Sequence, residues 1–123
     1  MANRIPVVVS GAAGRMGETA CAAVEGAEGM ELVGRADPAL DTKLTDVLEG
    51  AEVMVDFTTP DAAPANVLDA VNAGVNAVVG STGFDLEELR ATVEGASGEA
   101  KWFVAPNFAI GAALMMELSR QVA

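Results

Sequence analysis

The sequence IPVVVS at residues 5–10 is followed at once by Gly11-Ala12-Ala13-Gly14-Arg15-Met16-Gly17, and this junction is the strongest indication of the fold class. A short continuous apolar run rich in valine predicts a fully buried strand of the kind found in parallel sheets. Apolar side chains then recur at helical spacing between Met16 and Ala27. The stretch therefore predicts a buried strand, a glycine-rich turn, and a helix over 14–27.

The same alternation of strand and helix continues along the chain. Gly74 suits a helix C-cap, and Asp85 with Glu88 three residues later resembles a capping box. Strict alternation forces parallel strands joined by right-handed crossovers, with helices on both faces. We therefore predict one α/β domain over 1–123, a Rossmann-like doubly wound parallel sheet of about five strands. Further strands are predicted over 31–36, 53–57, 76–79 and 101–105, and further helices over 42–49, 58–73, 85–95 and 110–123.

The composition is that of an ordinary domain with an acidic surface. With 123 residues, 51% of them hydrophobic, the chain can bury a core without disulfide or metal staples. Its formal net charge of −11 repels phosphate backbones, so no nucleic-acid partner is expected. This charge fits simple solubility, with a salt-rich source as the alternative. No stretch suits a membrane span or a signal sequence, so a cytoplasmic location is expected.

Histidine is absent from the sequence, and Cys21 is its single cysteine. The commonest metal ligand and the commonest general acid or base at neutral pH are therefore missing. Cys21 falls within the predicted first helix, where a buried thiol is expected rather than a nucleophile. We expect no metal site and no catalytic side chain within these 123 residues.

The three glycines of the loop lie between a predicted strand and a predicted helix. Glycine allows a tight turn, lets backbone amides approach a phosphate, and permits close packing of helix on strand. The helix N-terminus adds amides without partners and the positive end of the helix dipole. The spacing from Gly11 through Gly14 to Gly17 is G-x-x-G-x-x-G. This context predicts a pyrophosphate-binding loop, and a purely structural turn is the alternative.

Asp37 ends the second predicted strand, twenty positions after Gly17. A carboxylate at this place can accept both hydroxyl groups of an adenosine ribose, which points to a dinucleotide. It would repel a ribose phosphate, so NAD(H) is favoured over NADP(H), although Arg15 could meet such a phosphate. The alternative is that Asp37 only forms a turn before Pro38.

Together with three later motifs, these features make the sequence resemble the N-terminal nucleotide-binding domain of the dihydrodipicolinate reductase family. The enzyme is also called 4-hydroxy-tetrahydrodipicolinate reductase. The resemblance runs from Val7 to about Met115, and it implies an NAD(P)H-dependent oxidoreductase of lysine and diaminopimelate biosynthesis. The motifs are Asp56-Phe57-Thr58, Gly80-Ser81-Thr82-Gly83-Phe84 and Ala105-Pro106-Asn107-Phe108.

The resemblance also implies which residues bind the cofactor. The glycine loop matches the family's pyrophosphate loop and Asp37 its ribose-binding acid. Phe57 and Thr58 match a turn beside the cofactor. The turn near the nicotinamide is matched by Gly80 and Thr82, and the segment bordering the nicotinamide by Ala105, Asn107 and Phe108.

Two departures from the family pattern limit what the resemblance implies. Pro38 follows the ribose-binding acid where members that use NADPH well often carry a basic residue, which again favours NAD(H). The family's substrate domain, with its His-His-x-x-Lys motif, has no counterpart here, and the predicted helix within 109–123 would lead towards it. These 123 residues alone are therefore expected to bind cofactor without turning over substrate, and the family implies a homo-oligomer, typically a tetramer. An exposed apolar stripe on the last helix would favour self-association.

Two other functions stay open at this point. One is a non-catalytic module that senses a dinucleotide, because catalytic residues are missing. The other is the cofactor domain of another amino-acid-pathway dehydrogenase, of the aspartate or homoserine type, although Ala105-Pro106-Asn107-Phe108 argues against it.

Overall fold

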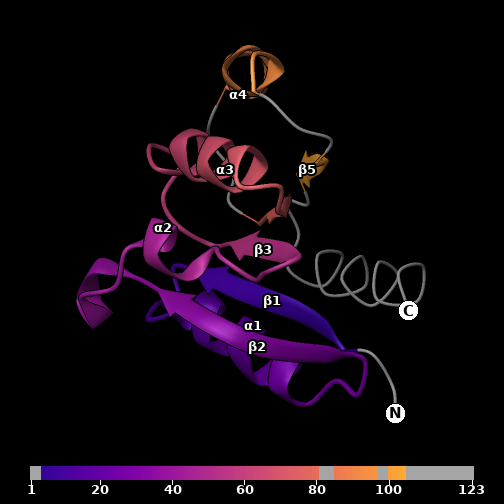
Figure 1. Cartoon of the computed structure of the whole chain (residues 1–123). Coiled ribbons are helices and arrows are strands. Elements are labelled where there is room, and N and C mark those ends of the chain that lie inside the picture. Colours follow the sequence, from indigo (N-terminus) through magenta and orange to yellow (C-terminus); the bar gives the residue numbers. More distant parts are fainter. Residues whose placement is uncertain (1–3, 81–84, 97–99, 105–123) are drawn as a thin grey trace.

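The computed structural model describes residues 4–80, 85–96 and 100–104, and they form a five-stranded sheet. All four strand pairs are parallel, in the order β2-β1-β3-β4-β5. The doubly wound Rossmann-like fold is thereby confirmed, with β3 as the middle strand between β1 and β4 (Figure 1). The strands are β1 (Ile5–Ser10), β2 (Met30–Ala36), β3 (Val53–Asp56), β4 (Asn76–Val79) and β5 (Trp102–Val104).

Helices cover both faces of the sheet, because the crossovers are right-handed and the strand order reverses direction after β2. Helix α1 packs against β1 and β2 on one face, whereas α3 packs against β3 and β4 on the other and contacts α2 and α4 (Figure 1). The helix predicted over 110–123 lies outside the described residues. The helical elements are α1 (Arg15–Glu25), the 3-10 turn η1 (Pro38–Leu40), α2 (Leu44–Val47), α3 (Ala63–Asn72) and α4 (Leu86–Glu94).

The hydrophobic core lies on both faces of the central strands, because successive side chains of a strand point to opposite faces. Val8 and Met54 join the cluster beneath α3, whereas Val7 and Val55 join a cluster on the other face. All four side chains are at most 1% exposed. Cys21 of α1 is also buried, and burial raises the pKa of its thiol, as expected of a structural cysteine.

The predicted C-terminal cap at Gly74 is confirmed, and Asp85 is confirmed as an N-cap. Gly74 follows α3 with φ +78°, and its amide donates to the carbonyl oxygen of Val71 at 3.0 Å. The amide of Val75 donates to the carbonyl oxygen of Ala70 at 2.8 Å, which completes a Schellman motif. Asp85 caps α4 by accepting from the amides of two residues in its first turn.

Several predicted boundaries were wrong by a few residues. Helix α3 begins at Ala63 and not at 58, because the carbonyl of Thr59 accepts from the amides of Ala62 and Ala63 in a turn that precedes the helix. Helix α2 covers only four residues of the predicted 42–49. It starts late because Asp41 is left-handed, with φ 55°, and Thr42 pairs with Asp37 in an isolated bridge.

Candidate functional site

The chain leaves β1 and β3 towards opposite sides of the sheet, so a crevice opens at the carboxyl ends of these neighbouring strands. The segments that follow the strands meet there. The glycine loop follows β1, Asp37 follows β2, Phe57 and Thr58 follow β3, and Gly80 follows β4. The topology therefore brings the predicted site residues among the described ones to one edge of the sheet.

Two of the loop glycines are required by close backbone contacts. Gly11 has φ +81°, and a Cβ added to it would lie 2.7 Å from the carbonyl oxygen of Phe57. A Cβ on Gly17 would overlap the carbonyl oxygen of Gly11. Gly14 has an ordinary φ of −78° and is the N-cap of α1. Gly11 and Gly17 thus allow the loop, the start of α1 and the segment after β3 to approach closely.

Hydrogen bonds fasten the glycine loop to the end of β2. The amides of Gly11 and Ala12 donate to the carbonyl oxygen of Ala36 at 2.8 and 3.2 Å. The amide of Ala13 donates to Oδ2 of Asp37 at 3.0 Å. The first amides of α1, at residues 15–17, have no acceptor within the helix, as in any α-helix. They can therefore donate to an anion beside the loop.

Asp37 caps a turn and also accepts a hydrogen bond from the glycine loop. Its Oδ1 accepts from the amide of Ala39 at 2.9 Å and so caps the 3-10 turn η1. Its Oδ2 holds the amide of Ala13. Each carboxylate oxygen has about two acceptor sites, so both oxygens keep capacity for a ligand hydroxyl. The turn-forming alternative is thus correct without excluding the ribose-binding one.

Phe57 is held between the glycine loop and the end of β4. Its amide donates to the carbonyl oxygen of Ser10 at 2.9 Å, and the amide of Gly80 donates to that of Asp56 at 2.8 Å. A Cβ on Gly80 would overlap the Phe57 ring. Gly80 is therefore needed to seat this ring.

A buried polar network that the sequence analysis missed lies at the ends of β1 and β3. Asp56 is 0% exposed, and its Oδ2 accepts from the hydroxyl of Thr58 at 2.8 Å. Its Oδ1 accepts from Nδ2 of Asn66 at 3.0 Å. Nδ2 also donates to Oγ1 of Thr58 at 3.2 Å, with a longer contact of 3.4 Å to Oγ of Ser10. Burial raises the pKa of the Asp56 carboxyl, while the hydrogen bonds from Thr58, Ser10 and Asn66 oppose that rise.

The raised pKa of Asp56 predicts a pH dependence of folding. The folded state binds the proton of Asp56 more tightly than the unfolded state, so the resulting stabilisation is complete below the unfolded pKa. It is lost as pH rises through the folded pKa. Relative to Asp56→Asn, the wild type should therefore lose free energy of unfolding as pH rises from about 4. Urea unfolding of both proteins over a pH series measures the two free energies, and a wild type that gains stability relative to Asp56→Asn as pH rises would contradict the prediction.

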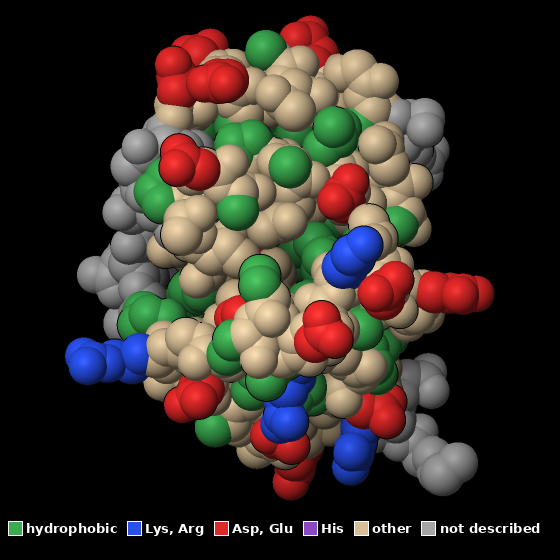
Figure 2. All heavy atoms as spheres, turned by 90° about the vertical axis from the view of Figure 1, so that its left-hand side faces the viewer, with side chains coloured by type: hydrophobic (Ala, Val, Ile, Leu, Met, Phe, Trp, Pro, Cys, Tyr) green, Lys and Arg blue, Asp and Glu red, His purple; other side chains and the backbone are tan. Residues whose placement is uncertain are grey.

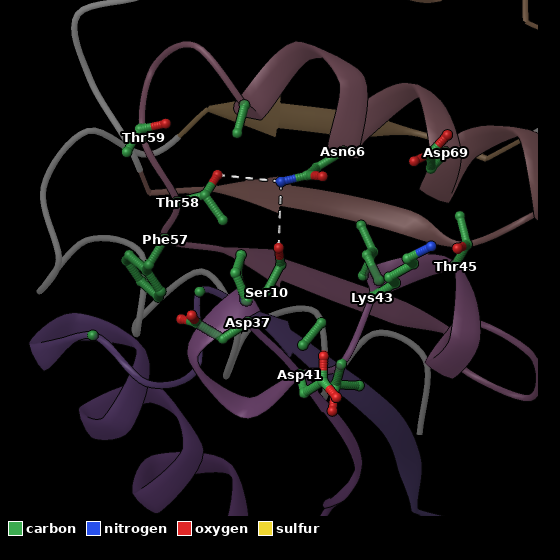
Figure 3. A pocket seen from close by; sticks show the side chains of 17 residues that line it. Ser10, Asp37, Asp41, Lys43, Thr45, Phe57, Thr58, Thr59, Asn66 and Asp69 are labelled. Carbon is green, nitrogen blue, oxygen red and sulfur yellow. Dashed lines mark hydrogen bonds between the residues drawn. The ribbon is translucent and has the colours of Figure 1, made fainter.

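A pocket of about 850 Å³ opens between the segment after β2 and the start of α3 (Figure 3). Gly11, Gly14, Asp37, Phe57 and Thr58 line it together. Figure 3 shows the amide nitrogen of Asn66 pointing towards Ser10 and Thr58. Three further acids or bases line the pocket, namely Asp41, Lys43 and Asp69.

The other predicted site residues do not line the pocket or lie outside the described residues. Arg15 and Met16 lie exposed in the first turn of α1, while Ala12 and Gly17 are buried beneath the loop. Ala13 contributes its amide to Asp37. Thr82, Ala105, Asn107 and Phe108 lie outside the described residues.

The described residues contain no group of three His, Cys, Asp or Glu that could hold a metal ion. Across the same ranges, no helix is long and apolar enough to cross a membrane. Acidic side chains are spread over the face drawn in Figure 2, in keeping with the net charge of −11.

Comparison with known proteins agrees with this geometry. Residues 5–108 match the family model described as dihydrodipicolinate reductase, N-terminus. The 4-hydroxy-tetrahydrodipicolinate reductase of Cutibacterium acnes is 46% identical over 121 residues, which are 97% of this chain and 48% of that protein. The enzyme of Nocardia farcinica is 45% identical over 122 residues, which again are 97% of this chain and 48% of that protein. The chain thus spans about half the length of the curated relatives it matches.

Solved structures show the same fold. Dipicolinate-bound dihydrodipicolinate reductase from Paenisporosarcina sp. TG-14 is 28% identical, with a TM-score of 0.66 over 94% of this chain and 52% of that one. Pyrroline carboxylate reductase from Plasmodium falciparum, with NADP bound, is 13% identical with a TM-score of 0.58 over 83% of this chain and 42% of that one, and shares the fold alone. The family match replaces the alternative of an aspartate- or homoserine-type enzyme. This chain belongs to the dihydrodipicolinate reductase family and corresponds to its N-terminal, nucleotide-binding part.

Proposed function

We propose that this chain binds NAD(H) as the cofactor half of a 4-hydroxy-tetrahydrodipicolinate reductase. The observation that carries the proposal is the hydrogen bond from the Ala13 amide to Asp37, which joins the glycine loop and the predicted ribose acid in one pocket. A loop for the pyrophosphate and an acceptor for the ribose then stand at the spacing that one dinucleotide requires. Dinucleotide binding uses both features at once.

Each part of the dinucleotide has a place in this proposal. The pyrophosphate lies at the first turn of α1, where Arg15 adds a positive charge. The adenosine ribose lies against Asp37. Phe57, Thr58 and Gly80 form the turn beside the cofactor, at the ends of β3 and β4. The family resemblance assigns the nicotinamide border to Thr82, Ala105, Asn107 and Phe108.

The charges of the pocket support NAD(H) over NADP(H). Asp37, Asp41 and Asp69 line it, and Lys43 is its one cation among the described residues. A ribose 2′-phosphate would meet this excess of negative charge, and Pro38 offers it no donor. NADP(H) is therefore the weaker ligand, helped only by Arg15 or Lys43.

The bound dinucleotide would supply a hydride for reduction of an electron-poor carbon. The residues described above bind and orient the cofactor, and none of the 123 residues is a histidine that could move the proton. We therefore expect no turnover from this polypeptide alone. Binding of the dicarboxylate substrate, assembly into a homo-oligomer and a cytoplasmic location are proposed for the whole enzyme.

Thermal unfolding with and without NADH tests the proposal. A ligand that binds only the folded state stabilises it by about 2.7 kcal/mol at a hundred times its Kd. NADH should therefore raise the Tm of the 123-residue chain in a concentration-dependent way. A Tm that stays constant up to millimolar NADH would contradict the proposal.

A further inference from the structure

The carboxylate of Asp56 lies directly beneath the floor of the pocket. Ser10, Thr58 and Asn66 form this floor and line the pocket, whereas Asp56 is 0% exposed behind them. Asp56 therefore cannot touch a ligand itself. It accepts hydrogen bonds from two of the floor side chains, Thr58 and Asn66, and no cation among the described residues pairs with it.

The side-chain protons of Thr58 and Asn66 point inward, to Asp56 and to one another. A hydroxyl has one proton, and that of Thr58 goes to Oδ2 of Asp56. Oγ of Ser10 lies 3.4 Å from Nδ2 of Asn66, at the edge of the same network. The amide nitrogen of Asn66 has two protons and directs them to Asp56 and Thr58. A ligand atom that meets the Thr58 hydroxyl therefore meets an oxygen whose proton is already engaged.

We propose that Asp56 is a positioning residue that makes the pocket floor an acceptor surface for O–H and N–H groups of the dinucleotide. The inference rests on the proposed function. The site then has two parts. Backbone amides at the start of α1 donate to the anion, while the pocket floor and Asp37 accept from hydroxyl or amino groups of the ligand. A phosphate placed against the floor would face oxygen lone pairs, which adds to the preference for a ligand without a 2′-phosphate.

Asp56→Asn tests the inference because it changes the direction of one hydrogen bond with almost no change in volume. The oxygen that accepts from Asn66 must remain an oxygen, so the new amide nitrogen replaces Oδ2 and faces Thr58 at the 2.8 Å contact. The Thr58 hydroxyl must then accept, and its proton turns away from residue 56. We expect calorimetry on the 123-residue chain to show NADH binding weakened about tenfold, roughly the effect of one hydrogen bond.

Glu52→Gln is the matched control, because Glu52 is exposed at the amino end of β3 and its change removes the same unit of charge. This control should bind NADH as the wild type does. If the wild type itself does not bind NADH, the proposed function and this inference both fail. If the wild type binds and Asp56→Asn binds equally well, only the inference is overturned.

The pair Asp56→Asn and Thr58→Val distinguishes positioning from a general effect on folding. If Asp56 acts through the Thr58 hydroxyl, Asp56→Asn should weaken NADH binding in the wild type but cause no further loss in the Thr58→Val background. The same tenfold loss in both backgrounds would overturn the inference. Should Asp56→Asn fail to fold, Thr58→Val decides the question. Loss of the acceptor oxygen of Thr58 should weaken NADH binding about tenfold, and wild-type affinity of this variant would overturn the inference.

Discussion

Gly17→Ala is expected to reduce NADH affinity by about 100-fold or more, the equivalent of losing at least one or two charge-assisted hydrogen bonds. The added Cβ would overlap the carbonyl oxygen of Gly11, a backbone atom that cannot rotate away. The start of α1 must therefore move off the loop, and the amides that we propose for the pyrophosphate move with it. The same overlap should lower the free energy of unfolding by about 1–3 kcal/mol.

Gly95→Ala is the control for this variant. Gly95 follows α4 with φ −85°, and a Cβ there would meet nothing within 4 Å. This variant should unfold and bind NADH like the wild type. Urea unfolding and calorimetric titration measure both effects, and wild-type NADH affinity in Gly17→Ala would show that the loop does not hold the pyrophosphate.

Asp37→Ala is expected to weaken NADH binding by roughly 10- to 100-fold and NADPH binding by less. Hydrogen bonds to a charged group are worth about 1.5–3 kcal/mol, and the ribose hydroxyls would lose this acceptor. NADPH loses less because removing the carboxylate also removes its repulsion of the 2′-phosphate. Part of the loss is indirect, since the amides of Ala13 and Ala39 lose their partner as well.

Calorimetric titration of Asp37→Ala with NADH and NADPH in parallel measures the change in preference. Asp46→Ala is the control, because Asp46 is an exposed acid of α2 that does not line the pocket. Equal weakening of the two cofactors by Asp37→Ala would refute its role at the ribose. It would leave Asp37 with the cap of η1 and the contact to the glycine loop.

Local patterns were sufficient to predict the strands and the glycine loop. The buried run at 5–10 and the strand at 76–79 have the predicted bounds, because continuous apolar segments between turn residues leave few alternatives. The start of α3 was wrong by five residues, since the turn at Thr59 depends on backbone hydrogen bonds that composition does not reveal. Local patterns could not predict the order of the strands in the sheet either. That order depends on whether each crossover places the next strand on the same side of the preceding one or on the opposite side.

The polar network around Asp56 could not be predicted because its members are far apart in the sequence. Ser10 and Asn66 are separated by 56 positions and meet only once β1, β3 and α3 are packed. One signal was present, namely an acid directly after the apolar residues of a buried strand. A buried acid needs donors, and the hydroxyl of Thr58 two residues later was the nearest one.

Calorimetric titration of the wild-type 123-residue chain with NADH and with NADPH is the most direct test of the account. We predict one binding site per chain for NADH and weaker binding of NADPH. Both titrations should lose their heat signal in Gly17→Ala. Absence of binding by either cofactor to the folded wild-type chain would contradict the assignment of the pocket to a nicotinamide dinucleotide.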